Sequence, residues 1–257
     1  MGRFVFVVLA ATACNGIIGL DGYRPCNGDE CDAGVDAADT GAAYAFCAPT
    51  VVKSCGGSTL DQCTDFESGL GWTPFNQNTG AVAIDTTTSC RGTKSLHATV
   101  GNTTASGARG DVYETQTFVS GTKPIWMRAF VYLPSASASK TALFLFAADS
   151  QGGNIVGVGA NAGFVQVENN VASHTRVSQT AFPVDRWTCL ELELAPNATS
   201  VSLDDVQVTD LSAAEPTSPS ASAGIVGAGI IANGNAPAEV WIDNVAVSAK
   251  APIGCAN

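Results

Sequence analysis

Short runs in which apolar and polar residues alternate fill the chain from about residue 64 to residue 250, with turn residues between them. A period of two is typical of β-strands, whose successive side chains point to opposite faces of a sheet. The expected strands cover residues 81–86, 94–100, 111–118, 124–133, 142–148, 154–160, 163–168, 187–194, 199–205, 206–211, 222–231 and 238–247. No segment shows a convincing long 3.6-residue period. The pattern predicts an all-β domain, a β-sandwich or jelly roll with one core.

Within the expected strands, alternation separates an apolar face from a polar and aromatic one. In residues 124–133 the apolar face consists of Ile125, Met127, Ala129, Val131 and Leu133, and the opposite face of Trp126, Arg128, Phe130 and Tyr132. In residues 187–194 and 94–100 the leucines mark the core side, whereas Glu191, Glu193 and His97 point away from it. If these strands belong to one sheet, that sheet is expected to have a concave face that carries aromatic rings and charged groups.

Such a face suits a sugar, because aromatic rings stack on the apolar faces of pyranose rings and charged groups bind hydroxyls. The expected ligand-binding residues are Trp126, Arg128, Phe130, Tyr132, Gln166 and Glu191. In the alternative interpretation the aromatic residues lie under a loop, and Arg128 simply pairs with Glu191 or Glu193. The sequence leaves both interpretations open.

The N-terminus has the layout of an export signal. One positive residue precedes an apolar run over residues 4–11, which is far shorter than the roughly 20 residues that a transmembrane helix needs. Small residues then lead directly to Cys14. This order resembles the lipobox of bacterial lipoproteins, which implies cleavage before Cys14 and its lipidation; the alternative is an ordinary signal peptide. Because Asn15 and not Asp follows, the resemblance favours an anchor at the outer membrane or cell surface.

Residues 14–57 are rich in Asp, Ala and Gly and contain few large apolar side chains. Such a segment buries too little surface to offset the entropy lost on ordering. The expected organisation is therefore a signal peptide (1–13), a tether (14–57) and a β-sandwich domain (58–257).

Charge and cysteine content narrow the choice of partner and compartment. The chain has 23 acidic and 12 basic residues, a formal net charge of −11 and no basic run. Nucleic acid and anionic lipid surfaces are therefore poor partners. Nine cysteines are an odd number, but eight can pair if Cys14 carries a lipid. Complete pairing predicts an oxidising compartment outside the cytosol.

Several short motifs, taken in their order, resemble one group of folds. CTDFESGLGW (63–72) and VWIDNVAVS (240–248) are similar to the first and last strands of concanavalin A-like and laminin-G-like jelly rolls and of related carbohydrate-binding modules. RGTKSL (91–96) and RWTCLELEL (186–194) with the following SVSLDD resemble inner strands of such domains. The likeness covers about residues 63 to 255. It implies a jelly-roll fold and a broad class, because such folds host many functions.

In several of these modules a first-strand Glu and a last-strand Asp share a structural Ca²⁺, which prefers carboxylate and carbonyl oxygens. The resemblance therefore implies Glu67 and Asp243 as calcium ligands; the alternative is two solvated carboxylates. The adjacent terminal strands of a jelly roll also imply a set of disulfides. The expected pairs are Cys63–Cys255, Cys90–Cys189, Cys47–Cys55 and Cys26–Cys31.

Catalysis is an open question at this stage. Glu191 and Glu193 share a strand face about 7 Å apart, a spacing that does not exclude glycoside hydrolysis. However, LELELAP lacks the E-x-D-x-x-E strand of concanavalin-like glucanases. His97, Arg128 and Tyr132 would supply residue types that jelly-roll polysaccharide lyases use, although no Q-[IV]-H strand is present.

Three hypotheses follow. The first choice is a lipid-anchored surface protein that binds polysaccharide or another glycan, the second a polysaccharide lyase or glycoside hydrolase, and the third a structural or adhesive surface protein. An open aromatic face would favour binding, and a cleft rimmed by Tyr132, Arg128, His97 and Glu191 would favour catalysis. A face covered by the protein's own loops would favour the structural role.

Overall fold

The computed structural model describes Cys47, Cys55 and residues 60–103, 107–116, 123–149, 154–217, 224–233 and 237–256. These residues all belong to one compact unit, Gly41–Asn257. Cys14 and the expected Cys26–Cys31 pair lie outside the described residues, as does nearly all of the expected tether. Within the described residues, no helix is long and apolar enough to cross a membrane.

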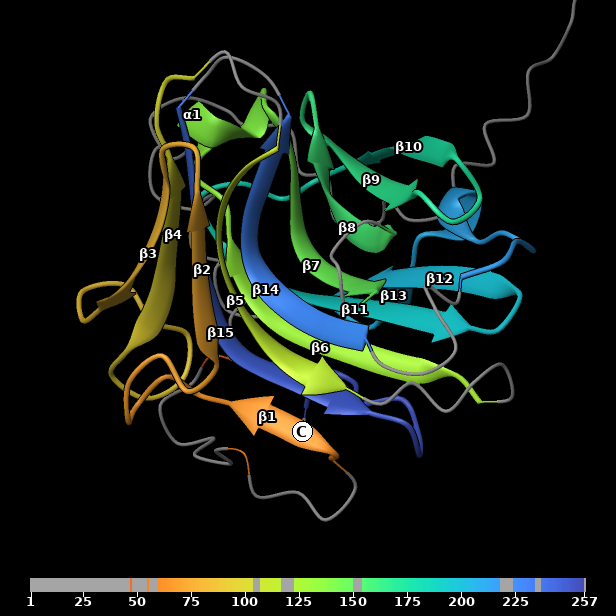
Figure 1. Cartoon of the computed structure of the whole chain (residues 1–257), viewed down its shortest axis with the longest axis horizontal. Helices are drawn as coiled ribbons and strands as arrows, with labels where there is room; N and C mark the ends of the chain where they lie inside the picture. The colour runs from red at the N-terminus through yellow and green to blue at the C-terminus, as the bar shows by residue number, and fades with distance from the viewer. Residues whose placement is uncertain are drawn as a thin grey trace, which may run out of the picture. The chain divides into compact units, whose positions relative to one another are not determined.

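Two antiparallel sheets make up the domain (Figure 1). The first sheet contains, in spatial order, β13 (Val206–Gln207), β12 (Ala198–Leu203), β11 (Trp187–Ala195), β6 (Ile125–Tyr132), β15 (Ala238–Ser248), β4 (Ser95–Val100) and β3 (Gly80–Asp85), with β1 (Gln62–Thr64) also paired to β15. The prediction of an all-β sandwich is confirmed.

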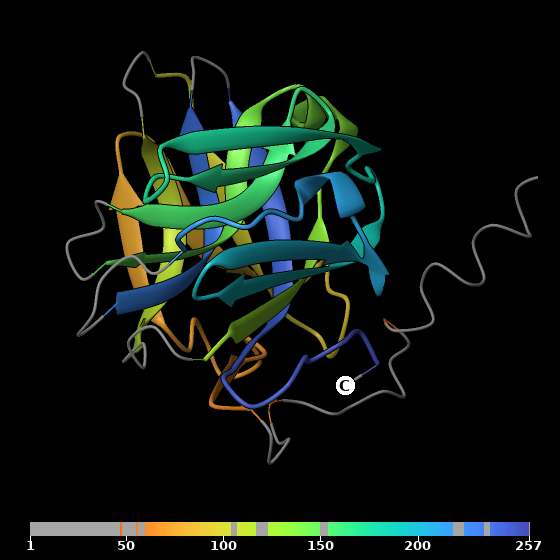
Figure 2. The ribbon, with the colours of Figure 1, turned by 90° about the vertical axis from the view of Figure 1, so that its right-hand side faces the viewer.

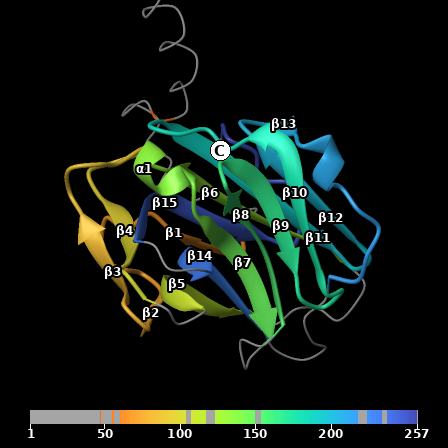
Figure 3. The same ribbon diagram turned by 90° about the horizontal axis from the view of Figure 1, so that it is seen from above.

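The second sheet contains, in spatial order, β10 (His174–Ala181), β9 (Phe164–Asn169), β8 (Ile155–Asn161), β7 (Thr141–Asp149), β14 (Gly224–Asn233), β5 (Ala108–Gln116) and β2 (Thr73–Gln77). Figure 3 shows β7, β8, β9 and β10 following one another across this sheet. In Figure 2 the β9–β10 and β11–β12 hairpins, one from each sheet, face the viewer. Two short helical elements lie between the strands, α1 (Ser135–Ala138) and the 3₁₀ turn η3 (Thr209–Leu211).

The apolar faces of the two sheets meet in one core. The core face expected in β6 is confirmed, because Ile125, Met127, Ala129, Val131 and Leu133 are all buried in this core. The leucines of β11 join it from the first sheet, and Val165 and Val167 of β9 join it from the second. Each strand therefore has an outer face, and the two outer faces are where chemistry can be displayed.

Strand β15 lies in the middle of the first sheet, between β6 and β4. Its register against β6 shifts between Asp243 and Ala246, where Asn244 has a positive φ of 49°. This bulge lets the second half of β15 pair with β1 on its other edge. The expected strand at residues 206–211 is shorter than predicted, because only Val206–Gln207 pair before the η3 turn.

Three disulfides join Cys47 to Cys90, Cys55 to Cys63 and Cys189 to Cys255. The expected pairs Cys63–Cys255, Cys90–Cys189 and Cys47–Cys55 are therefore wrong. Although β1 and β15 are neighbours as expected, the chain after β15 returns across β11, which carries Cys255 to Cys189 and away from Cys63. All six of these cysteines are nevertheless disulfide-bonded, as the sequence predicted.

Candidate functional site

The outer face of the first sheet holds most of the residues expected to bind a ligand. In the ladder between β6 and β11, Arg128 lies opposite Glu191, Trp126 opposite Glu193 and Phe130 opposite Cys189. These side chains point away from the core, as the alternation predicted. The ladder therefore brings Trp126, Arg128, Phe130 and Glu191 together.

The C-terminal segment 253–255 covers the centre of this face. Glu191 Oε2 accepts hydrogen bonds from the backbone N–H groups of Ile253 and Gly254, both at 2.9 Å. Arg128 Nη1 donates to the Gly254 carbonyl at 3.2 Å. The segment is also fixed by the Cys189–Cys255 disulfide. The acidic and basic side chains expected to hold a sugar thus hold the backbone of the protein's own tail.

Beneath the tail, two arginines flank one aromatic ring. The guanidinium carbons of Arg91 and Arg128 lie 4.4 and 4.9 Å from the Phe130 ring centroid. Arg91 Nη2 donates to the Cys255 carbonyl at 2.8 Å. Burial, together with the neighbouring Arg91 charge, lowers the pKa of Arg128 to about 10. Arg128 and Phe130 are buried, so this part of the face is closed to a polymer.

An aromatic group at the far end of the same face stays partly exposed. The His97 ring stacks on Trp241 with centroids 4.2 Å apart, and its Nε2 lies 3.0 Å from Glu239 Oε2. Tyr132 meets both Trp241 and Trp187 edge-on. His97 is thus engaged with β15 rather than with Arg128.

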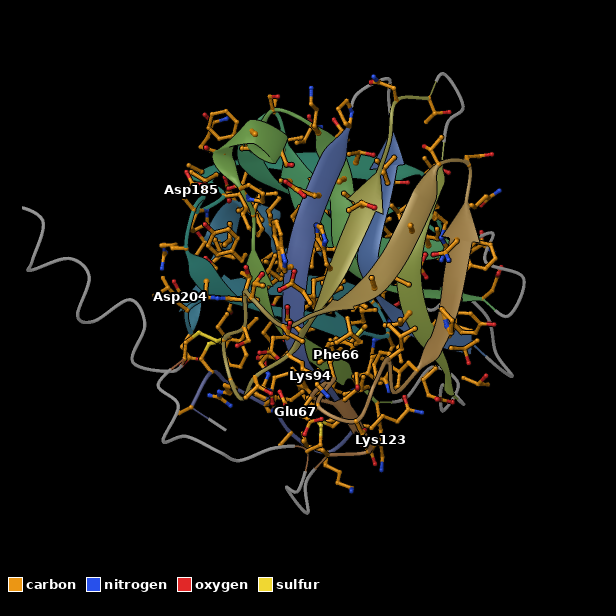
Figure 4. All side chains as sticks on the ribbon, turned by 90° about the vertical axis from the view of Figure 1, so that its left-hand side faces the viewer. Phe66, Glu67, Lys94, Lys123, Asp185 and Asp204 are labelled. Carbon is orange, nitrogen blue, oxygen red and sulfur yellow. A yellow bond between two sulfur atoms is a disulfide. The ribbon has the colours of Figure 1, made fainter. Side chains whose placement is uncertain are left out.

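The two carboxylates expected to bind calcium both hold the loop before β4. Glu67 Oε1 accepts from the backbone N–H groups of Thr93 and Lys94 at 2.7 and 2.8 Å, and Figure 4 shows Glu67 and Lys94 close together. Asp243 Oδ2 accepts from the N–H groups of Cys90 and Arg91 at 3.0 and 2.8 Å. Among the described residues, no three His, Cys, Asp or Glu side chains cluster as a metal site. Calcium binding at this loop stays a prediction.

The outer face of the second sheet has a different character. Its central strands present glycines at Gly157 and Gly159 of β8 and at Gly227 and Gly229 of β14. The Phe146 ring lies directly over Gly227. A Cβ at this glycine would come within 3 Å of the ring carbons, so no larger residue fits there. The polar side chains of this face come from the flanking strands, β5 on one side and β9 on the other.

On β5, Arg109 and Asp111 form a bidentate ion pair. Arg109 Nε lies 2.8 Å from Asp111 Oδ1, and Nη2 lies 3.0 Å from Oδ2. The Arg109 guanidinium carbon also lies 4.8 Å from the Phe75 ring centroid and 5.1 Å from that of Phe146. The guanidinium is thus held by a carboxylate and two aromatic rings. We call these four residues the Arg109 cluster.

The Arg109 cluster combines a deeply buried acid with a surface that solvent reaches. Asp111 is fully buried, whereas the Arg109 side chain is 11% exposed and Phe75 38%. Burial raises the pKa of the Asp111 carboxyl, although the paired guanidinium acts in the opposite direction. The ion-pair bonds use Nε and Nη2, so the Nη1 edge of the guanidinium has no partner among the described residues.

Gln166, which the sequence grouped with Arg128, belongs to β9 of the second sheet. Its side chain is fully buried on the outer face, and Nε2 donates to the Ala142 carbonyl at 3.3 Å. Gln166 is therefore separated by the whole sandwich from the residues with which it was expected to act. Glu168 shares its face, as the alternation predicted.

The Arg109 cluster was not predicted from the sequence. The expected strand began at residue 111, so Arg109 fell in a turn, whereas β5 begins at Ala108. Arg109, Asp111 and Tyr113 stand at alternate positions, and this period of two could have indicated that the strand begins before residue 111. The contribution of Phe75 was not readable, because β2 is a short exposed edge strand without an apolar face.

Comparison with known proteins identifies the fold. No family model matches the sequence, and no curated protein matches it. Among solved structures, the cellulose-induced protein Cip1 is similar, with 20% identity over 76% of this chain and 100% of that chain and a TM-score of 0.59. An endo-β-1,4-glucuronan lyase from the fungus Trichoderma reesei shares 16% identity over 74% of this chain and 95% of that chain, with a TM-score of 0.53.

The fold is a concanavalin A-like jelly roll. A sialidase also resembles this domain, at 12% identity and a TM-score of 0.51, over 74% of this chain but only 18% of its own. At these identities the likeness concerns the fold alone. It confirms the concanavalin A-like jelly roll that the strand motifs indicated.

Proposed function

We propose that this protein binds a polysaccharide along the outer face of the second sheet, with Arg109 as the anchor for an acidic sugar unit. The observation that carries the proposal is the Arg109 cluster, in which a partly exposed guanidinium is held between two aromatic rings and a buried carboxylate. A fixed guanidinium loses little freedom when it binds a carboxylate through two parallel hydrogen bonds. The exposed Phe75 ring beside it offers a surface on which a pyranose ring can stack.

The outer face of the first sheet supports this choice by exclusion. Its arginines and Glu191 already bind the chain's own C-terminal segment, which favours a structural role for that face. On the second sheet the central glycines are covered by a low apolar layer that includes Leu143, Phe146 and Ile231, over which a polymer could lie. Two proteins of similar fold have names that refer to cellulose induction and to glucuronan cleavage, which adds support for a carbohydrate ligand.

A polysaccharide lyase is the second candidate. Arg109, Asp111 and Tyr113 alternate along β5 and therefore share its outer face. Elimination at a uronate needs a group that neutralises the carboxylate and another that moves a proton, and Arg109 and the Tyr113 hydroxyl are of these types.

We also propose that the protein is exported and anchored through a lipid on Cys14. The order of charged, apolar and small residues before Cys14 supports the proposal. Three disulfides among the remaining cysteines fit an oxidising compartment. Metabolic labelling with a fatty acid would test it, with Cys14→Ser as the control that should lose the label.

The binding proposal is tested with the mature chain carrying Cys14→Ser and two matched probes. One probe is soluble glucuronan, and the other is the same polymer after chemical reduction of its carboxyl groups. We expect wild type to be depleted by glucuronan and less by the reduced polymer. Arg109→Gln should weaken glucuronan binding by about 10- to 100-fold, since a hydrogen bond to a charged group contributes about 1.5–3 kcal/mol. Arg186→Gln, which removes a surface ion pair with Asp204, is the matched control.

The same incubation separates binding from cleavage. A lyase would generate unsaturated uronate ends with a new ultraviolet absorbance, and Tyr113→Phe should abolish it. Depletion without new ends would establish a binding protein. If neither polymer depletes wild type and no new ends form, the proposed function is wrong.

A further inference from the structure

On the outer face of the second sheet, β9 lies on the far side from the Arg109 cluster and carries a buried hydrogen-bond acceptor, the side-chain oxygen of Gln166. Gln166 Nε2 donates to the Ala142 carbonyl, but Oε1 is buried and has no hydrogen-bond partner among the described residues. Buried polar atoms in proteins are nearly always paired, so each exception asks for an explanation. A group reserved for a ligand is one such explanation.

The backbone around Gln166 explains how its side chain comes to lie flat on the sheet. Ala142 belongs to β7 and Gln166 to β9, so the amide must cross β8 at Gly159, which lies opposite Gln166 in the ladder. A Cβ at Gly159 would approach the Ala142 carbonyl oxygen to 2.0 Å, the same oxygen that accepts the Gln166 hydrogen bond. Glycine is therefore required at position 159, and no side chain of β8 stands between the Gln166 amide and the backbone beneath it.

Two exposed apolar side chains flank the amide on the same face. Val177 of β10 lies directly opposite Gln166 and is 44% exposed. Phe164 precedes Gln166 by two residues on β9, so it shares the face, and it is 41% exposed. An exposed ring beside an unpaired acceptor matches the two features of a sugar, an apolar ring face and a hydroxyl hydrogen.

The charge at this end indicates which kind of sugar would fit. The free atom of Gln166 accepts hydrogen bonds and cannot donate one to a carboxylate. Glu168 lies two residues further along the same face, so an acidic sugar would be repelled. Arg109 lies four strands away, at most about 19 Å at the spacing of neighbouring strands.

We propose that Phe164, Gln166 and Val177 form a subsite for a neutral sugar unit, in which a hydroxyl donates to Gln166 Oε1 and the ring stacks on Phe164. This inference rests on the proposed function, because it assumes that a glycan lies on this face. It goes further by giving the face two chemically different ends. The ligand is then a polymer with an acidic unit at β5 and a neutral unit at β9.

The test uses the ¹⁵N-labelled mature chain with Cys14→Ser, titrated with the neutral disaccharide cellobiose. We expect the Gln166 side-chain amide signal, identified by its loss in Gln166→Leu, to shift together with the backbone amides of Phe164 and Val177. Phe164→Ala should weaken this binding at least 5-fold, whereas Phe75→Ala, an equally exposed ring at the other end, should change it less than 2-fold. Phe164→Ala also keeps the test valid if Gln166→Leu does not fold.

The outcomes separate this inference from the proposed function. If the Gln166 amide does not move at the highest cellobiose concentration, or if Phe164→Ala binds like wild type, the subsite is refuted even when glucuronan still depletes the protein. If the amide shifts and Phe164→Ala weakens binding while glucuronan is not bound, the subsite stands and the Arg109 anchor fails. A cellobiose effect abolished by Phe75→Ala but not by Phe164→Ala would also overturn the inference.

Discussion

Asp243 offers a quantitative test of how the outer face of the first sheet is held together. Its carboxyl group is fully buried and accepts the backbone N–H groups of Cys90 and Arg91. Burial raises its pKa from the ordinary 3.8 to about 6, although these hydrogen bonds act in the opposite direction. The two buried guanidinium groups near it, Arg91 and Arg128, also favour the ionised form.

The sign of the effect follows from the two protonation states. Below pH 3.8 the carboxyl is protonated in both the folded and the unfolded chain. Between pH 3.8 and about 6 the unfolded chain is ionised whereas the folded chain still holds the proton, so rising pH favours unfolding. Above about pH 6 both states are ionised and the effect stops. At 1.36 kcal/mol for each pKa unit, Asp243 lowers the free energy of unfolding by about 3 kcal/mol across this window.

The perturbation is Asp243→Asn, which keeps an oxygen acceptor for the two N–H groups and does not titrate. Urea unfolding would be measured from pH 4 to pH 8 for wild type and variant. We expect the stability of wild type relative to the variant to fall by about 2 kcal/mol as the pH rises from 4 to 6, and by less than about 0.5 kcal/mol more as the pH rises to 8. Subtracting the variant's free energy of unfolding from that of wild type removes the pH dependence that other carboxyls contribute to both. Asp85 is one of these, and its pKa is lowered to about 2 by hydrogen bonds that outweigh its partial burial.

A difference that stays flat from pH 4 to pH 8 would refute the reasoning. It would mean that the two guanidinium groups keep Asp243 ionised in the fold at every pH tested. A difference that rises with pH would go further, because it would show that the folded pKa lies below the ordinary value. Either result would make attraction by the arginines, rather than burial, the dominant effect on this carboxyl.

Three further results are expected. Glu191→Ala should lower the free energy of unfolding by about 2–3 kcal/mol and make the C-terminal segment sensitive to carboxypeptidase, because two partly buried N–H groups lose a charged acceptor. Glu193→Ala should cost less than about 1 kcal/mol by the same urea assay, since its carboxylate accepts only the Ser200 hydroxyl among the bonds described for it. Replacing Cys189 and Cys255 together by Ser should cost about 4 kcal/mol, as expected for a loop closed over a sequence separation of 66, and a loss below about 1 kcal/mol would contradict that estimate. If the two carboxylates at the loop before β4 bind calcium, Tm should rise with the logarithm of calcium concentration and fall in chelator, whereas equal values would count against the calcium prediction.

Alternation along the strands was sufficient to predict the fold class and the faces of β6, β11 and β9. It could not predict which sheet a strand joins, because a period of two reports burial of one side and not the identity of the neighbouring strand. Gln166 was therefore assigned to the wrong sheet, although its face was correct. Arg128 was correctly placed on an outer face, but nothing in the short sequence APIGC signals that this tail returns to cover it.

The disulfides show the same limit. Cys63 and Cys255 flank the first and last strands of the domain, and those strands are neighbours, yet the two cysteines do not pair. Their partners depend on the paths of the segments outside the strands, which have no periodicity to read. The Arg109 cluster was missed for a related reason, since it depends on a contact between β5 and the edge strand β2.

The central position of β15 has a consequence for how the first sheet assembles. Without Ala238–Ser248 the neighbouring strands fall into two separate groups, β11–β12–β13 with β6 on one side and β3–β4 on the other. Pairing of β15 with β6 and with β4 is therefore the step that joins the two groups into one sheet.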